Sequence, residues 1–177
     1  MMHGMQTIVR RPRFLVFQMA GLMMLLSLGC SMPPPDGNNN DNDNTSGSSE
    51  PFFPANYREA FTEVRDCRNS IGHTATIRVY VNAIGVEAYL ADENPLPVGT
   101  VVVKEEFGGT ACSDDADLEF WRAMMKESAG FDPDDGDWRW QMVSAPDRDV
   151  ILDTKATCIA CHRAPDCVAR DYMCTEP

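Results

Sequence analysis

Residues 100–107, "TVVVKEEF", are the stretch that decides the fold of this chain. The run of β-branched residues predicts a strand, and strand alternation puts Val102 and Lys104 on one face with Glu105 facing the other way. The preceding "NPLPVG" contains two prolines and a glycine, which interrupt regular structure. We therefore expect a strand that begins directly after a loop.

Three further segments resemble this strand in their patterning. Residues 74–82, "TATIRVYVN", and 138–143, "WRWQMV", alternate apolar and polar side chains. Residues 118–126, "LEFWRAMMK", suit a helix or a strand, and we favour a strand. A turn is expected over residues 130–137, "GFDPDDGD", because proline, glycine and aspartate dominate it. The alternation predicts an antiparallel sheet of about four strands.

Two segments have helical spacing instead. Residues 55–67, "ANYREAFTEVRDC", place Tyr57, Phe61 and Val64 on one face of a helix. Residues 83–91, "AIGVEAYLA", predict a second, shorter helix. The fold class expected is α+β, with the sheet flanked by helices, and the length of residues 52–177 suits one domain.

The N-terminal region has the composition of an export signal. Residues 1–29 carry three arginines and no acidic residue, and an apolar run of residues 14–28 follows the arginines. The run ends in "LSLGC", which resembles the site where bacterial lipoproteins are cleaved and lipidated, here at Cys30. We expect residues 1–29 to be a lipoprotein signal peptide, with a plain secretion signal or a short signal anchor as alternatives. Because serine rather than aspartate follows Cys30, an outer-membrane protein facing the periplasm is favoured.

Residues 30–51 connect the lipidation site to the folded domain. They are rich in Pro, Asn, Asp, Gly and Ser, so they cannot bury enough apolar surface to order themselves. This composition predicts a disordered tether. Without residues 1–29 the chain keeps 12 basic against 27 acidic residues, a net charge of −15. That charge argues against nucleic acid as a partner and favours a small substrate or a basic redox partner, although a plain acidic surface explains it equally.

The chain contains seven cysteines, which can be assigned to three roles. Setting aside Cys30 for lipid and two cysteines of a C-terminal motif leaves an even number, as expected for disulfides in an oxidising compartment. Three pairings of the four are open. We favour Cys67 with Cys112 and Cys167 with Cys174, because the second pair would clamp the segment that follows the motif.

That motif is "CIACH", residues 158–162. Covalent haem attachment needs two thiols that reach the two vinyl groups of one porphyrin and an imidazole that binds the iron, and C-x-x-C-H supplies them. Cys158 and Cys161 would form the thioethers, and His162 would be the axial ligand of a single haem c.

Other roles for the motif have less support. A zinc site would need a second pair of ligands, and His73 is the one other histidine after residue 30. A thioredoxin-type motif would follow a strand in a βαβ unit, and no such pattern precedes Thr157. The remaining alternative is a haem-free lipoprotein in which Cys158 and Cys161 form a third disulfide.

The order "IRVYVN", "LPVGTVVVKEEF", "GFDPDDGDWRW" and "CIACH" resembles the cytochrome P-460 and cytochrome c′-β haem proteins over about residues 55–175. The resemblance implies a dimeric, sheet-rich fold with c-type haem on one face of the sheet. It also implies a haem oxidoreductase that oxidises hydroxylamine or a related small nitrogen species, which in this chain would be lipid-anchored through Cys30. The alternative within the resemblance is a module that binds nitric oxide or transfers electrons without catalysis.

The resemblance also suggests roles for individual residues. The lysine that is cross-linked to the porphyrin in hydroxylamine-oxidising members matches Lys104, for which the plain alternative is a solvent-facing strand lysine. Those members use a distal carboxylate as proton acceptor, whereas this chain has Arg122 at the matching position, which argues against hydroxylamine oxidation. Phe120 and Trp121 are candidates for an apolar distal wall or for the core, and His73 and Met142 are candidates for a sixth iron ligand.

Overall fold

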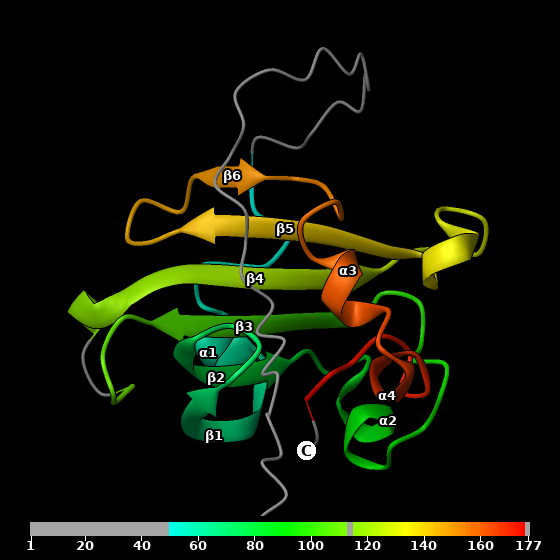
Figure 1. Ribbon diagram of the computed structural model, residues 1–177, viewed down its shortest axis with the longest axis horizontal. Helices are drawn as coiled ribbons and strands as arrows, with labels where there is room; N and C mark the ends of the chain where they lie inside the picture. The colour runs from blue at the N-terminus through cyan, green and yellow to red at the C-terminus, as the bar shows by residue number, and fades with distance from the viewer. Residues whose placement is uncertain (1–49, 113–114, 176–177) are drawn as a thin grey trace, which may run out of the picture.

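A six-stranded antiparallel sheet forms the centre of the computed structural model, which describes residues 50–112 and 115–175 (Figure 1). The strands are β1 (Thr62–Ser70), β2 (Ala75–Val81), β3 (Val101–Phe107), β4 (Leu118–Lys126), β5 (Trp138–Ser144) and β6 (Val150–Leu152). Their order in the sheet is their order in the sequence. Each strand therefore pairs with the one before it, as antiparallel neighbours do when short connections join them.

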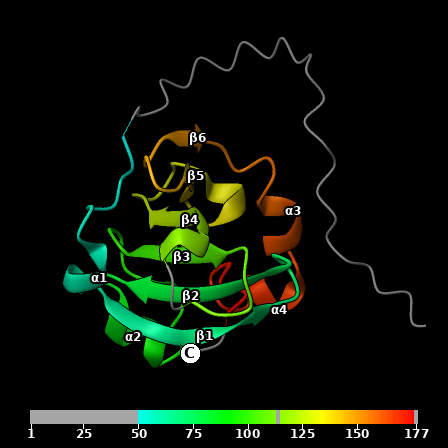
Figure 2. The same ribbon diagram turned by 90° about the vertical axis from the view of Figure 1, so that its left-hand side faces the viewer.

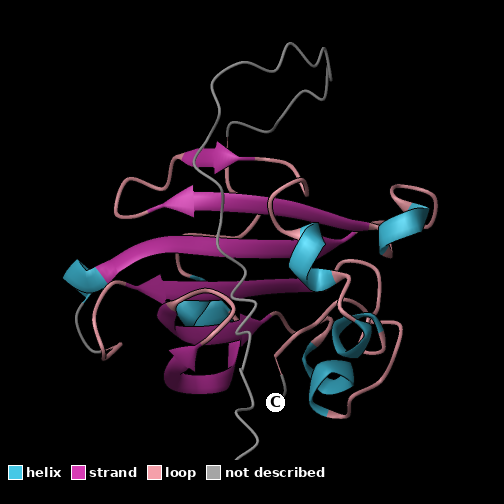
Figure 3. Ribbon diagram, viewed as in Figure 1, coloured by secondary structure: helices cyan, strands magenta, loops and turns pink. Residues whose placement is uncertain are grey.

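The helices are short and lie on both faces of this sheet. They are α1 (Tyr57–Ala60), α2 (Val86–Leu90), α3 (Ile159–His162) and α4 (Pro165–Val168), with 3₁₀ turns at Asp115–Asp117 and Pro133–Asp135. Figure 2 shows α1 on one side of the sheet and α3 and α4 on the other. Figure 3 shows that strands make up most of the regular structure, so the α+β class is confirmed with more strands than the sequence predicted.

Strand β3 is covered on both faces, and all seven of its residues are buried. As predicted, Val102 and Lys104 share one face while Glu105 lies on the other. Glu105 is fully buried there and accepts a hydrogen bond from Nε of Arg78 at 2.8 Å. Glu106 returns to the face of Lys104. The two faces thus have separate cores, one of which contains the functional site described below.

The prediction of a helix over residues 55–67 was wrong for most of its length. Helix α1 ends at Ala60, and β1 begins at Thr62 and pairs with β2. The side chains of Tyr57, Phe61 and Val64 have helical spacing, but tertiary pairing with β2 overrides this local pattern. Strand β6 has three residues, too few for alternation to identify it.

Two disulfides join pairs of cysteines that both lie within the described residues. Cys67 is joined to Cys112, which links β1 to the segment after β3, and Cys167 is joined to Cys174 beyond the C-x-x-C-H motif. These are the two pairings that the sequence analysis favoured. No helix within the described residues is long and apolar enough to cross a bilayer. The predicted signal peptide, Cys30 and nearly all of the tether lie outside the described residues.

Candidate functional site

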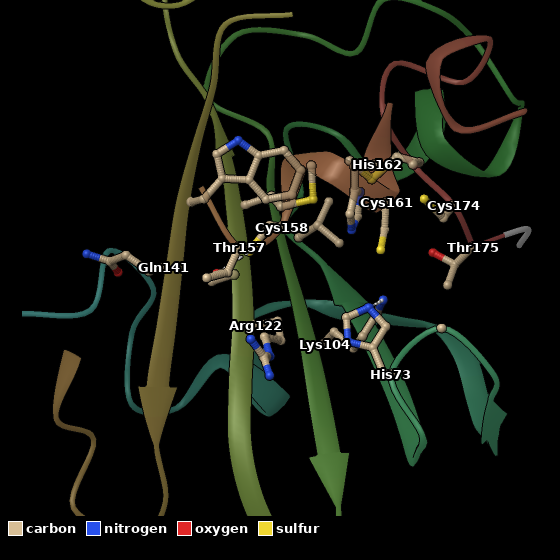
Figure 4. A pocket seen from close by; sticks show the side chains of 16 residues that line it. His73, Lys104, Arg122, Gln141, Thr157, Cys158, Cys161, His162, Cys174 and Thr175 are labelled. Carbon is tan, nitrogen blue, oxygen red and sulfur yellow. Dashed lines mark hydrogen bonds between the residues drawn. The ribbon is translucent and has the colours of Figure 1, made fainter. Parts of the chain in front are cut away.

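A cavity opens on one face of the sheet, between β3, β4 and β5 and the C-terminal segment (Figure 4). The empty space in and above it, including space open to solvent, is about 750 Å³. Its apolar wall is made by Val102, Met124, Trp140 and Met173. The polar side chains that reach it come from the C-x-x-C-H motif and from β3, β4 and the β1–β2 turn.

The motif lies against this cavity with all three of its chemically active side chains. Cys158, Cys161 and His162 line the cavity, and Ile159 packs into the core beside it. Burial of Ile159 therefore fixes the single turn of α3 that carries the thiols and the imidazole. Burial also raises the pKa of the Cys158 thiol.

His162 is held in one orientation by a main-chain contact. Its Nδ1 lies 2.7 Å from the carbonyl oxygen of Tyr172, so Nδ1 carries the hydrogen and Nε2 keeps its lone pair. Burial lowers the pKa of His162 to about 4, which keeps the ring neutral at pH 7. The ring of Trp140 packs against it edge-on, with centroids 4.7 Å apart. A neutral imidazole fixed through Nδ1 is the form in which histidine binds a metal.

Lys104 reaches the same cavity from β3. It pairs in register with Arg122 of β4, and both side chains line the cavity. Burial lowers the pKa of Lys104 to about 8, so roughly a tenth of the amine is unprotonated at pH 7. Its Nζ lies 2.9 Å from Nε2 of His73. The solvent-facing position considered for Lys104 from the sequence is therefore wrong.

Glu106 connects His73 to Arg122 beside the lysine. One carboxylate oxygen is in ion-pair contact with Nδ1 of His73, and the other accepts a hydrogen bond from Nε of Arg122 at 3.0 Å. Burial alone would raise the pKa of Glu106, but the His73 contact and the Arg122 charge together lower it. Glu106 is therefore ionised although it is buried.

The acidic turn between β4 and β5 contacts the residues on either side of the C-x-x-C-H motif. Asp135 is fully buried and accepts hydrogen bonds from Nε of Arg163 at 2.7 Å and from Lys155, the residues that flank the motif. Gly136 has φ of 70°, and a Cβ atom there would lie 2.6 Å from the ring of Tyr172. The turn thus contacts both ends of the motif. It also packs against Tyr172, whose carbonyl oxygen orients His162.

Two predicted wall residues lie elsewhere. Trp121 packs on the opposite face of the sheet, where its Nε1 donates to the hydroxyl of Tyr57 at 2.8 Å. Phe120 is not among the described residues that line the cavity, although Arg122 stacks near its ring. Alternation along β4 already separates Trp121 from Arg122, so this signal was present in the sequence.

Sequence reasoning did not identify the roles of Glu106, Trp140 or the Tyr172 carbonyl, and it considered His73 only as an iron ligand. The parity of β3 puts Glu106 on the face of Lys104, which was a usable signal. A main-chain carbonyl leaves no mark in a sequence. His73 is 31 residues from Lys104, and only the pairing of β2 with β3 brings them together.

The donor set fits a covalently bound haem. Two cysteines at the correct spacing and a neutral histidine whose Nε2 is available face one largely apolar cavity. A buried lysine stands on its opposite wall. These residues would hold the porphyrin through the thiols and its iron through His162.

Comparison with known proteins agrees with this geometry. A family model described as Cytochrome P460 matches residues 54–175, which is most of the chain and all of the described strands. No curated protein matches the chain.

Proposed function

Because this chain belongs to the cytochrome P460 family, a family of haem proteins, we propose that it is a c-type cytochrome that oxidises hydroxylamine or a related small nitrogen species. In this proposal Cys158 and Cys161 attach the haem and His162 binds its iron. When bound, the haem supplies a redox-active iron that takes electrons from the substrate and passes them to a partner protein. The residues of the chain bind, orient and shield the reacting groups.

The observation that carries the proposal is the position of Lys104. Its amine is buried on the cavity wall, and a pKa of about 8 leaves it partly unprotonated, as a nucleophile must be. These properties support a covalent link between Lys104 and the porphyrin, which the resemblance to hydroxylamine-oxidising members implies.

Arg122 remains a departure from the oxidising members. A guanidinium cannot accept a proton, so Arg122 does not replace the expected carboxylate. Its partner Glu106 is an ionised carboxylate whose two oxygens are engaged by His73 and Arg122. Because these contacts lower its pKa, Glu106 is a weaker proton acceptor than an unpaired carboxylate would be.

The test compares the ferrous absorption spectrum of the wild type with that of Lys104→Leu. A Soret band far to the red that Lys104→Leu abolishes is the expected result, together with hydroxylamine turnover that the variant loses. Met124→Leu is the matched control, because it changes the same wall without removing an amine and nearly conserves volume. An ordinary high-spin c-type spectrum in the wild type would contradict the cross-link.

Peptide mapping gives the cross-link a second readout. Trypsin cleaves after Lys155 and Arg163, so the attachment peptide is residues 156–163. A link at Lys104 blocks cleavage there and joins this peptide through the haem to residues 79–122 after reduction of the disulfides. Recovery of the attachment peptide without its companion would contradict the link.

A second candidate function is binding of nitric oxide or electron transfer without catalysis. The apolar wall of Val102, Met124, Trp140 and Met173 favours a small neutral gas. A five-coordinate haem without a cross-link that binds nitric oxide and does not turn over hydroxylamine would support this candidate over the first.

We further propose that the domain is tethered to the outer membrane through lipid on Cys30 and faces the periplasm. The export-type residues 1–29 and the composition of residues 30–51 support this location. The net charge of −15 after removal of the signal favours a basic electron-transfer partner. A homodimer is proposed from the family resemblance.

A further inference from the structure

Arg122 brings a permanent positive charge to the wall of the cavity. Apart from the histidines, Arg122 and Lys104 are the basic residues that line it, and no carboxylate of a described residue does. Figure 4 shows both on the wall across from Cys158 and Cys161. The chain without residues 1–29 has a net charge of −15, so this concentration of basic groups is local to the cavity. A bond between Lys104 and the porphyrin would remove the ammonium and leave Arg122 as the permanent cation.

Glu106 holds one nitrogen of Arg122 and leaves two nitrogens without a partner. Its Oε2 accepts a hydrogen bond from Nε of Arg122 at 3.0 Å, and Glu106 does not itself line the cavity. Nη1 and Nη2 of Arg122 make no hydrogen bond to the residues that the structure describes, although the side chain is only 13% exposed. Their N–H groups are therefore available to a molecule that occupies the cavity.

Unpaired donors on a mostly buried guanidinium favour one kind of partner. Buried polar groups in proteins are nearly always hydrogen-bonded, and leaving such a donor unpaired costs free energy. A guanidinium is planar, and its nitrogens match the two oxygens of a carboxylate or oxyanion, which it binds through two parallel hydrogen bonds. Hydroxylamine offers a guanidinium neither a negative charge nor a pair of oxygens.

We propose that Arg122 binds an anion in the cavity through Nη1 and Nη2, while Glu106 keeps the guanidinium in place. Two sources supply an anion of this chemistry. One is a propionate carboxylate of the haem, and the other is a small nitrogen oxyanion, such as nitrite, that binds at the iron. The inference rests on the proposed function for the presence of the haem, and it gives Arg122 a role that hydroxylamine oxidation does not use.

The test variants remove the anion site without stranding a buried charge. Arg122→Met alone would leave Glu106 without one of its partners, so Arg122→Met/Glu106→Gln removes the pair together. Arg122→Lys keeps the positive charge and loses the planar fork. Arg139→Met/Asp153→Asn is the matched control, because Nη2 of Arg139 lies 2.7 Å from Asp153 and neither residue lines the cavity.

The first measurement gives dissociation constants from absorbance, with nitrite on the ferric haem protein and carbon monoxide, a neutral probe, on the ferrous form. If the partner is a small oxyanion, Arg122→Met/Glu106→Gln should weaken nitrite about 10- to 100-fold, the usual effect of losing charge-assisted hydrogen bonds. Arg122→Lys should weaken nitrite less, by about three- to tenfold. Carbon monoxide binding should not change.

The second measurement is the resonance Raman spectrum of the ferric protein without added ligand. If the partner is a haem propionate, the propionate bending band should shift in both Arg122 variants while nitrite binding stays constant. The control pair Arg139→Met/Asp153→Asn should leave the band and both dissociation constants as in the wild type. These two readouts therefore distinguish the two sources of the anion.

The proposal is overturned if neither nitrite affinity nor the propionate band changes in the Arg122 variants. It is also overturned if the control pair produces the same changes, or if nitrite and carbon monoxide weaken equally while the band is constant. Absence of hydroxylamine turnover in the wild type would overturn the proposed function and leave the anion site standing. A wild type without haem would overturn both.

Discussion

Nδ1 of His162 lies 2.7 Å from the carbonyl oxygen of Tyr172, and the backbone that presents this carbonyl is unusual. Asp171 and Tyr172 both have positive φ, 53° and 67°. Residues other than glycine adopt this conformation at a cost, so it persists only where surrounding contacts impose it. The contacts of Asp171 and Tyr172 therefore control the orientation of His162.

Lys126 is the first of these contacts. Its Nζ lies 2.7 Å from both carboxylate oxygens of Asp171, and both residues are buried. Lys126→Met would leave a buried carboxylate without its charge partner, which typically costs about 3–5 kcal/mol of unfolding free energy. Urea unfolding followed by circular dichroism measures this loss.

Arg170→Met is the matched control for that variant. It breaks the ion pair with Asp92, whose side chain is 61% exposed, so the loss should stay below about 1 kcal/mol. Equal losses of unfolding free energy in the two variants would show that the buried Lys126–Asp171 pair stabilises the fold no more than an exposed ion pair does. Replacing Asp171 with asparagine in the Lys126→Met background should recover part of the loss, because the uncompensated charge is gone.

Removal of each disulfide in turn should distinguish an effect on unfolding free energy from an effect on the haem environment. Cys67 and Cys112 are 45 residues apart and Cys167 and Cys174 are 7 apart, so loop entropy predicts losses of about 4 and about 2.4 kcal/mol when each pair is changed to alanine. Only the second loop contains Tyr172. We therefore expect the haem absorption spectrum to change in the Cys167→Ala/Cys174→Ala protein and to stay constant in the other.

The opposite pattern, a spectrum that responds only to loss of the Cys67–Cys112 bond, would contradict the role given to the Tyr172 carbonyl. Denaturant unfolding and the ferric spectrum can be recorded on the same samples, so the two effects are compared directly.

Acid should release the turn that braces the motif. The hydrogen bond from Arg163, followed by that from Lys155, holds the pKa of Asp135 below its ordinary value of 3.8. A lowered carboxylate pKa contributes stability at neutral pH that is lost as pH falls through the folded-state pKa. Asp135→Asn should therefore lower Tm at pH 7 by about 5 °C, and this effect should disappear as pH falls through the lowered pKa of Asp135.

Asp134→Asn is the control in the same turn, because its side chain is exposed and its contact with Tyr172 uses the main-chain oxygen. Its Tm should follow that of the wild type at both pH values. A deficit for Asp135→Asn that persists unchanged in strong acid would rule out the carboxylate as its cause.

Much of the sheet was predictable because β2 and β5 alternate apolar and polar side chains and β3 begins with a run of β-branched residues. Strand β1 was not, since its helical spacing is local whereas its pairing with β2 is tertiary. Predictions from a single chain segment cannot weigh hydrogen bonds that a distant strand supplies.

The residues of the site also differ in whether the sequence alone could predict them. The positions of Cys158, Cys161 and His162 follow from the covalent geometry of haem, which is local in sequence. The placement of Lys104 on the cavity face follows from strand parity. His73 and the Tyr172 carbonyl enter the site through a turn and a strained backbone, and neither has a local pattern that reveals its partner.

The central claim is that "CIACH" carries a covalent haem, and the most direct test is the mass of one peptide. The full chain is produced in a bacterial host with a cytochrome c maturation system, and the tryptic peptide of residues 156–163 is isolated under conditions that extract non-covalent haem. The account predicts that this peptide carries one haem, alone or joined to a second peptide, and that Cys158→Ala/Cys161→Ala removes it. An unmodified peptide from a wild-type protein without a Soret band would contradict the account.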